Sequence, residues 1–154
     1  MEQMLNNVKE FHAHIGETIR DKATLLPSGT GEAAAFAADL HKLVAKYRVN
    51  KSPLSELVRR MCLNLEELAE WSDAHANGDI VEATDALADR LYCLIGDAVS
   101  TGLPLQEAFE IVHKSNLTKS KGKSNPAGKG VKDAGFVPPQ LTDLLENSTK
   151  KNAE

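Results

Sequence analysis

Two long stretches with the apolar spacing of α-helices, joined by a link of three residues, constrain the fold of this chain more than any other feature. The first stretch predicts a helix from Ser52 to about Ala76. Ser52 is the expected N-cap, because Pro53 and Glu56 follow it at the positions of a helix-starting proline and a capping box. The apolar stripe of this helix comprises Leu54, Leu57, Val58, Met61, Cys62, Leu65, Leu68 and Ala69.

The second stretch predicts a helix from Ile80 to about Ser100. Asn77-Gly78 ends the first helix, and so short a link makes the two helices antiparallel neighbours. The second helix is apolar nearly all round, a pattern that is typical of a buried helix.

Helical spacing also covers most of the remaining chain, over residues 1–19, 32–47, 105–116 and, briefly, 140–146. No strand pattern of useful length appears, and aromatic residues make up only 5% of the chain, which suits close helix packing better than a sheet sandwich. We therefore predict an all-α fold, a helical bundle of about four to five main helices. We expect one domain over residues 1–146, which contains a lysine- and glycine-rich loop at 115–135, and a polar tail at 147–154.

Five carboxylates on the paired helices are the candidate metal ligands: Glu66, Glu67, Glu70, Asp85 and Asp89. Spacings of three and four residues stack side chains on one helical face, so each helix presents a compact acidic patch. The three glutamates lie opposite the apolar stripe, where a solvated face is also expected. Two facing patches need a cation, since a pair of like charges at about 5 Å costs about 3 kcal/mol at an effective dielectric near 20. Hard oxygen ligands without nearby Cys or His favour Mg²⁺, with Mn²⁺ as a substitute.

A basic segment lies late in the chain, where six lysines occur between residues 111 and 132 without a single acid. They are Lys114, Lys119, Lys121, Lys123, Lys129 and Lys132. One interpretation is a solvated lysine-rich segment. The other is a loop that closes over the phosphates of a substrate, with Lys129 and Lys132 among the candidate ligands.

The charge and apolar patterns exclude several classes of protein. A net charge of −4 argues against a protein whose whole surface serves nucleic acid, although the basic segment is a local exception. No apolar run approaches the thickness of a bilayer. The first residues mix charged and apolar side chains and lack a signal-peptide core. We therefore expect a soluble, cytoplasmic protein with no membrane partner.

Three motifs together resemble a known family: Glu66-Glu67-x-x-Glu70, then Asp85-Ala-Leu-Ala-Asp89-Arg-Leu-Tyr92, then Ser115-Asn116-Leu117-Thr118-Lys119. In order and spacing they are similar to the all-α nucleoside triphosphate pyrophosphohydrolase superfamily, the MazG-like group, and more narrowly its phosphoribosyl-ATP-pyrophosphohydrolase-like branch. The similarity extends from Val8 to Pro139 and so covers most of the chain.

The resemblance implies a helical bundle that assembles as a homodimer or homotetramer and cleaves a nucleoside triphosphate between its α and β phosphates. Carried over by position, Glu66, Glu67, Glu70 and Asp89 are the carboxylates that hold Mg²⁺ and activate water, with Glu66 or Glu67 as the base. The resemblance also implies that Asn116 lies near the base or sugar of the nucleotide and that Lys119 lies near a phosphate.

One departure from the family pattern affects the second acidic motif. The group has Glu three residues before the aspartate, and here that position is Ala86, so Asp85 is the obvious substitute. Glu82-x-x-Asp85 also fits the bare pattern, but it leaves Asp89 unexplained. The number of metal ions therefore stays open, as do the base and sugar of the substrate.

Two further functions compete with this one. The first is a non-enzymatic helical module that binds a partner or nucleic acid through its acidic face or its lysine-rich segment. The second is hydrolysis of phosphoribosyl-ATP, which Ala86 and the lysine-rich segment disfavour.

Overall fold

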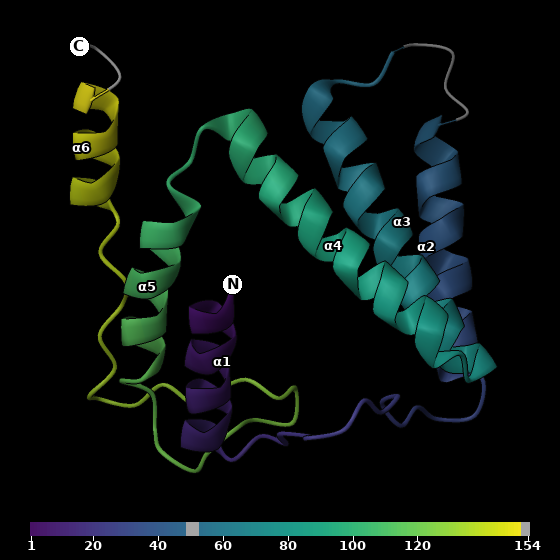
Figure 1. Ribbon diagram of the computed structural model, residues 1–154, viewed down its shortest axis with the longest axis horizontal. Helices are drawn as coiled ribbons and strands as arrows, with labels where there is room; N and C mark the ends of the chain where they lie inside the picture. The colour runs from purple at the N-terminus through teal and green to yellow at the C-terminus, as the bar shows by residue number, and fades with distance from the viewer. Residues whose placement is uncertain (49–52, 152–154) are drawn as a thin grey trace. The chain divides into compact units, whose positions relative to one another are not determined.

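The computed structural model describes residues 1–48 and 53–151 and confirms the all-α prediction (Figure 1). Its described residues form six helices: α1 (Glu2–Ile15), α2 (Glu32–Arg48), α3 (Glu56–Asn77), α4 (Ile80–Thr101), α5 (Leu105–Asn116) and α6 (Thr142–Lys151). The β structure in these ranges is one isolated antiparallel bridge between Ser124 and Gly130. Among the described helices, none combines the length and the apolar character that a membrane crossing requires.

The chain divides into two compact units. One consists of residues Lys22–Thr101 and holds α2, α3 and α4. The other combines Met1–Asp21 with Gly102–Glu154 and holds α1, α5 and α6. The single domain over 1–146 stays a prediction.

Helix α3 is the centre of the first unit, because α2 and α4 both pack against it (Figure 1). Alanines allow α2 to approach closely, and Ala37 of α2 and Ala69 of α3 have no exposed surface. The hydroxyl of Ser72 donates a 2.8 Å hydrogen bond to the backbone oxygen of Ala33 and so ties α3 to the start of α2. The link to α4 turns at Gly78, whose φ of 72° is the left-handed conformation that glycine favours.

The start of α3 differs from the prediction. The helix begins at Glu56, and Ser55 is its N-cap, with a hydroxyl that accepts a 3.4 Å hydrogen bond from the Val58 amide. Pro53 precedes the helix, and the expected N-cap Ser52 lies outside the described residues. Both serines precede an apolar run at plausible spacing, so the local pattern did not distinguish them.

The expectation that α4 is buried is wrong. Only Ala83 and Ala86 of this helix are buried, and Tyr92 and Val99 are 80% and 78% exposed. The apolar stripe of α3 is also divided, because Cys62 and Ala69 are buried while Leu57 is exposed. The reason is that α4 meets one neighbour along one side, and small residues mediate that contact.

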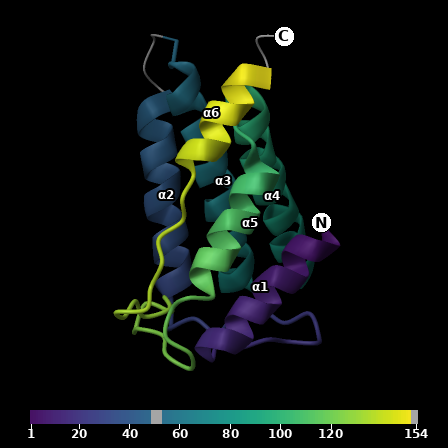
Figure 2. The same cartoon turned by 90° about the vertical axis from the view of Figure 1, so that its left-hand side faces the viewer.

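The second unit pairs α1 with α5, which lie side by side in both views (Figures 1 and 2). His113 of α5 lies 3.1 Å from a carboxylate oxygen of Glu10 on α1. Helix α1 ends at Ile15, before the predicted residue 19, because Gly16 adopts a left-handed φ of 79°. Helix α6 continues to Lys151, past the predicted end at Glu146, so part of the expected tail is helical.

Hydrogen bonds hold the loop between α5 and α6. The Ser115 hydroxyl donates to the Val137 backbone oxygen at 2.6 Å, and the Thr118 hydroxyl accepts from the Val137 amide at 2.8 Å. The Ser120 hydroxyl donates to Asp133 at 2.6 Å, which closes the lysine-rich stretch between them. The segment predicted as a basic loop therefore has a defined backbone path.

Candidate active site

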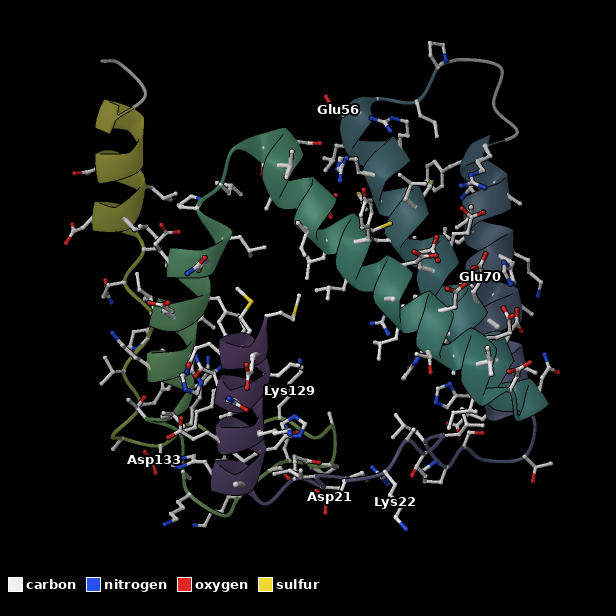
Figure 3. The ribbon with its side chains drawn as sticks, in the orientation of Figure 1. Asp21, Lys22, Glu56, Glu70, Lys129 and Asp133 are labelled. Carbon is white, nitrogen blue, oxygen red and sulfur yellow. The ribbon has the colours of Figure 1, made fainter. Side chains whose placement is uncertain are left out.

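The three glutamates of the first acidic motif lie on the stretch of α3 that α2 and α4 flank, where Figure 3 labels Glu70. Glu66 and Glu67 are half-buried, and Glu70 is exposed. The face opposite the apolar stripe is therefore not simply the solvated one. Both neighbouring helices reduce its contact with water.

Glu67 is in the least favourable electrostatic position of the five predicted ligands. Its Oε2 atom is buried and has no hydrogen-bond partner. Burial raises the pKa of the Glu67 carboxyl, and the nearby charges of Glu70, Asp89 and Glu66 raise this pKa further. Acids from both helices therefore act on one carboxylate, as the two-patch prediction requires.

Glu66 is paired with a residue that the sequence analysis did not select. Arg48, in the last turn of α2, donates from Nη1 to Glu66 Oε1 and from Nη2 to Glu66 Oε2, both at 2.5 Å. This is a fork-to-fork pair, the strongest geometry of an arginine with a carboxylate. The sequence does show a basic residue at the end of the preceding helix. A prediction that this residue pairs with Glu66 would have required knowledge of how α2 packs on α3.

Asp85 lies in a different part of the acidic region. Together with Glu70 it lines a cavity of about 230 Å³, whose other acidic and amide residues are Asp73, Asn77, Asp79 and Glu82. Asp79 is partly used as the cap of α4, where it accepts hydrogen bonds from the amides of Val81 and Glu82. Glu82 and Asp85 therefore share this cavity, whereas Asp89 acts electrostatically on Glu67.

The donor set fits a hard divalent cation in its chemistry. All five predicted ligands supply carboxylate oxygens, and the buried oxygen of Glu67 lacks a partner that a cation would provide. Among the residues that the structure describes, no group of three or more Asp, Glu, His or Cys side chains is arranged so that it could hold a metal ion.

A polar network beside the acids fixes α4 against α3. Arg60 donates from Nε to Asp97 at 2.5 Å and from Nη2 to the backbone oxygen of Cys93 at 3.3 Å. Asn64 donates to the second oxygen of Asp97 at 2.9 Å. Burial raises the pKa of the Cys93 thiol, and the nearby charges of Glu67 and Asp89 raise this pKa further. The thiol next to the acids is therefore protonated.

The predicted phosphate ligands belong to the other unit. The Lys119 ammonium lies 5.2 Å from the centre of the Phe11 ring, and the Lys132 ammonium lies 4.6 Å from the centre of the Phe136 ring. Burial lowers the pKa of Lys119, and the neighbouring charges of Lys132 and Lys129 lower it further (Lys129 is labelled in Figure 3). The structure therefore brings these three predicted lysines together.

Asn116 is half-buried at the end of α5, and its backbone oxygen accepts from the Lys119 amide at 3.1 Å. The site residues thus form two groups: the acids with Arg48 on α2, α3 and α4, and the lysines with Asn116 around the loop after α5.

Comparison with known proteins agrees with this architecture. The crystal structure of a protein from Exiguobacterium sp. 255-15, assigned to the NTP pyrophosphohydrolases, has the same fold at a TM-score of 0.53 and 22% identity, over 97% of this chain and 95% of that one. Among curated proteins, none matches at a significant level. The family model of phosphoribosyl-ATP pyrophosphohydrolase matches residues 37–116, just over half of the 154-residue chain, and this match contains both acidic motifs. The chain therefore belongs to the phosphoribosyl-ATP pyrophosphohydrolase family, within the all-α NTP pyrophosphohydrolases.

Proposed function

We propose that this protein is a Mg²⁺-dependent nucleoside triphosphate pyrophosphohydrolase that releases a nucleoside monophosphate and pyrophosphate. The observation that carries the proposal is the buried, unpartnered oxygen of Glu67 among the charges of Glu66, Glu70 and Asp89. Such an arrangement is costly unless a cation compensates it. Mn²⁺ is the expected substitute for Mg²⁺.

Glu67, Glu70 and Asp89 are the residues that would hold the cation, with Asp85 and Glu66 as further ligands. Bound there, the ion supplies charge neutralisation at the phosphate oxygens. Glu66 or Glu67 is the candidate base that accepts the proton of the attacking water, since both carboxylates border the acids that would hold the cation. Water then adds at the α–β linkage, the phosphoanhydride bond breaks, and pyrophosphate leaves.

The lysine group is proposed to bind phosphate groups, and Asn116 the sugar or base of a nucleotide. Lys119 supports this role, since its neighbours Lys129 and Lys132 lower its pKa and an anion would relieve their mutual repulsion. A desolvated ammonium also forms stronger hydrogen bonds with a phosphate than a fully hydrated one.

Phosphoribosyl-ATP is a second candidate substrate, because the family model that matches residues 37–116 carries that name. Its hydrolysis breaks the same type of bond and needs the same acids. The two substrates differ in the group attached to the base, so only direct comparison separates them.

We further propose that the active form is a homodimer or homotetramer. Exposed apolar side chains on α3 and α4, among them Leu57, Leu87 and Leu94, form a surface suited to a second copy.

The deciding experiment measures phosphate release from a panel of ribo- and deoxyribonucleoside triphosphates and phosphoribosyl-ATP with Mg²⁺, with and without added inorganic pyrophosphatase. Phosphate that appears only with the added enzyme establishes cleavage between the α and β phosphates and identifies the substrate. No turnover of any compound, together with no Mg²⁺-dependent nucleotide binding, contradicts the proposal and favours a binding module.

A paired variant tests the acids. Glu70→Gln with Asp89→Asn should abolish turnover and keep the helical circular dichroism signal. The matched control is Glu56→Gln with Asp39→Asn, which changes two exposed acids of α3 and α2 and should keep full activity. Turnover that survives in the first variant contradicts the metal-site assignment.

A further inference from the structure

Arg48 is placed to do more than pair with an acid. It lies at the end of α2, where its guanidinium engages both oxygens of Glu66. Among the ion pairs of the described residues, this is the one that involves a predicted metal ligand. The contact therefore withholds one carboxylate from the acidic group.

The pair is accessible from solvent. The side chain of Arg48 is 44% exposed, and that of Glu66 is 27% exposed. An exposed ion pair of this kind contributes little to folding, so it can open without loss of the fold. The neighbouring Glu67 gains nothing from Arg48, because its buried oxygen stays unpartnered.

The guanidinium has donors to spare. It carries five N–H groups, of which two point at Glu66, and its planar fork binds phosphate oxygens as well as carboxylates. Because Arg48 contacts Glu66, it borders the region where a triphosphate held by the acids through a cation would lie. Charge also favours the exchange, since a triphosphate is a stronger anion than one carboxylate.

We propose that Arg48 is a substrate-binding residue that exchanges partners: it neutralises Glu66 when no divalent cation is bound there, and it moves to a phosphate oxygen when Glu66 turns to the cation. The inference rests on the proposed function and adds a cation from α2 to the binding of the phosphates. The exchange also couples the two binding steps. The cation takes Glu66 from Arg48, and the triphosphate takes Arg48 from Glu66, so each ligand strengthens the binding of the other.

The test uses the full chain, Mn²⁺ as the cation and inorganic tripolyphosphate as a probe that needs no base. Electron paramagnetic resonance of free Mn²⁺ gives the affinity of the cation alone. Calorimetry with tripolyphosphate at saturating Mn²⁺ gives the affinity of the phosphate chain. Arg48→Met removes the charge and keeps the length of the side chain.

Arg48→Met should bind Mn²⁺ alone about two- to fivefold more tightly, because Glu66 is released from its pair. The same variant should bind tripolyphosphate about tenfold more weakly or worse, because a charge-assisted contact is lost. Arg59→Met is the matched control: it removes the same charge from an exposed pair with Glu56 and should change neither affinity.

Unchanged tripolyphosphate affinity in Arg48→Met overturns the inference, and so does unchanged affinity for Mn²⁺ alone. If the methionine variant does not fold, Arg48→Lys replaces it. This variant keeps the charge but loses the fork, and should weaken tripolyphosphate binding severalfold. Failure of the proposed function looks different, since the unmodified protein then binds no Mn²⁺ with or without tripolyphosphate.

Discussion

Glu67 combines three properties that rarely occur together in a carboxylate without a function. It has a buried oxygen, no partner for that oxygen, and acids from two helices around it. Each property reduces the stability of the folded chain when the group is ionised. We infer that this arrangement serves to bind a cation, because the ionised carboxylates repel one another when no cation is bound.

Removal of the Glu67 charge should therefore stabilise the protein prepared without divalent cations. Glu67→Gln keeps the shape and supplies an amide in place of the ionised carboxylate. We expect its melting temperature at pH 8 to rise by roughly 2–4 °C for each kcal/mol of relieved repulsion, measured by scanning calorimetry with chelator present. Glu110→Gln, at an exposed position of α5, should leave the melting temperature unchanged. A lower melting temperature for Glu67→Gln contradicts the assignment of strain to this carboxylate.

The pH dependence of that gain follows from the direction of the pKa shift. The folded pKa of Glu67 lies above its ordinary value of 4.5, so folding disfavours the charged form. The advantage of Glu67→Gln should be full above the raised pKa and vanish below about pH 4.5, where both states carry the proton. A difference in melting temperature that is constant from pH 8 to pH 4 excludes this origin.

Helix pairing depends on polar contacts more than the sequence suggested. Hydrogen bonds among Arg60, Asn64 and Asp97 join α3 to α4 next to the acids. The approach is close, since a Cβ added at Gly96 would lie 2.7 Å from the Arg60 guanidinium. This network fixes which residues of α4 face Glu67.

Loss of Asp97 should weaken the α3–α4 pair. Asp97→Ala leaves Arg60, whose side chain is 17% exposed, without its counter-ion. Because the pair is partly exposed, we expect a loss of about 1–2 kcal/mol in the free energy of unfolding, measured by urea titration. Asp39→Ala, which breaks an exposed pair with Lys42, is the control and should cost less than about 1 kcal/mol. Equal losses in the free energy of unfolding for Asp97→Ala and Asp39→Ala would show that this network stabilises the fold no more than an exposed ion pair does.

Asp133 should hold the lysine-rich loop closed. The pKa of its carboxyl is lowered by hydrogen bonds from the Ser120 hydroxyl and the Gly135 amide and by the charge of Lys123. The folded loop therefore favours the ionised carboxylate. Asp133→Ala should speed tryptic cleavage at the loop lysines, read by mass spectrometry, while Asp21→Ala should not. In the unmodified protein the order of the loop, read by hydrogen exchange of its amides, should persist above about pH 3.8 and fade as pH falls through the lower folded pKa. Cleavage rates that match in both variants would contradict this role.

Periodicity predicted the helices, because a 3.6-residue repeat is a local property that survives without knowledge of packing. The spacing also selected the five acids, and three of them, Glu66, Glu70 and Asp89, act electrostatically on a fourth, Glu67. Spacing did not reveal Arg48, since its partner Glu66 follows 18 positions later on another helix. It likewise overestimated the burial of α4, because an apolar helix is buried only where a neighbour covers it.

The exposed apolar side chains of α4 bear on the assembly of the whole protein. Leu87, Leu91 and Leu94 line, with Leu65 and Leu68 of α3, a groove of about 420 Å³. Exposed leucines at this density cost solubility unless another surface covers them. The proposed homodimer or homotetramer supplies such a surface.

A charge in this groove should dissociate the assembly. Leu94→Glu places a carboxylate where a second copy would bury a leucine, so we expect the dissociation constant of the oligomer to rise at least about tenfold. Multi-angle light scattering across a range of concentrations measures this change. Gln106→Glu, which adds the same charge at an exposed position of α5, should keep the oligomer intact. An unmodified protein that is monomeric at every concentration contradicts the assembly, while dissociation in both variants would show that net charge alone is responsible.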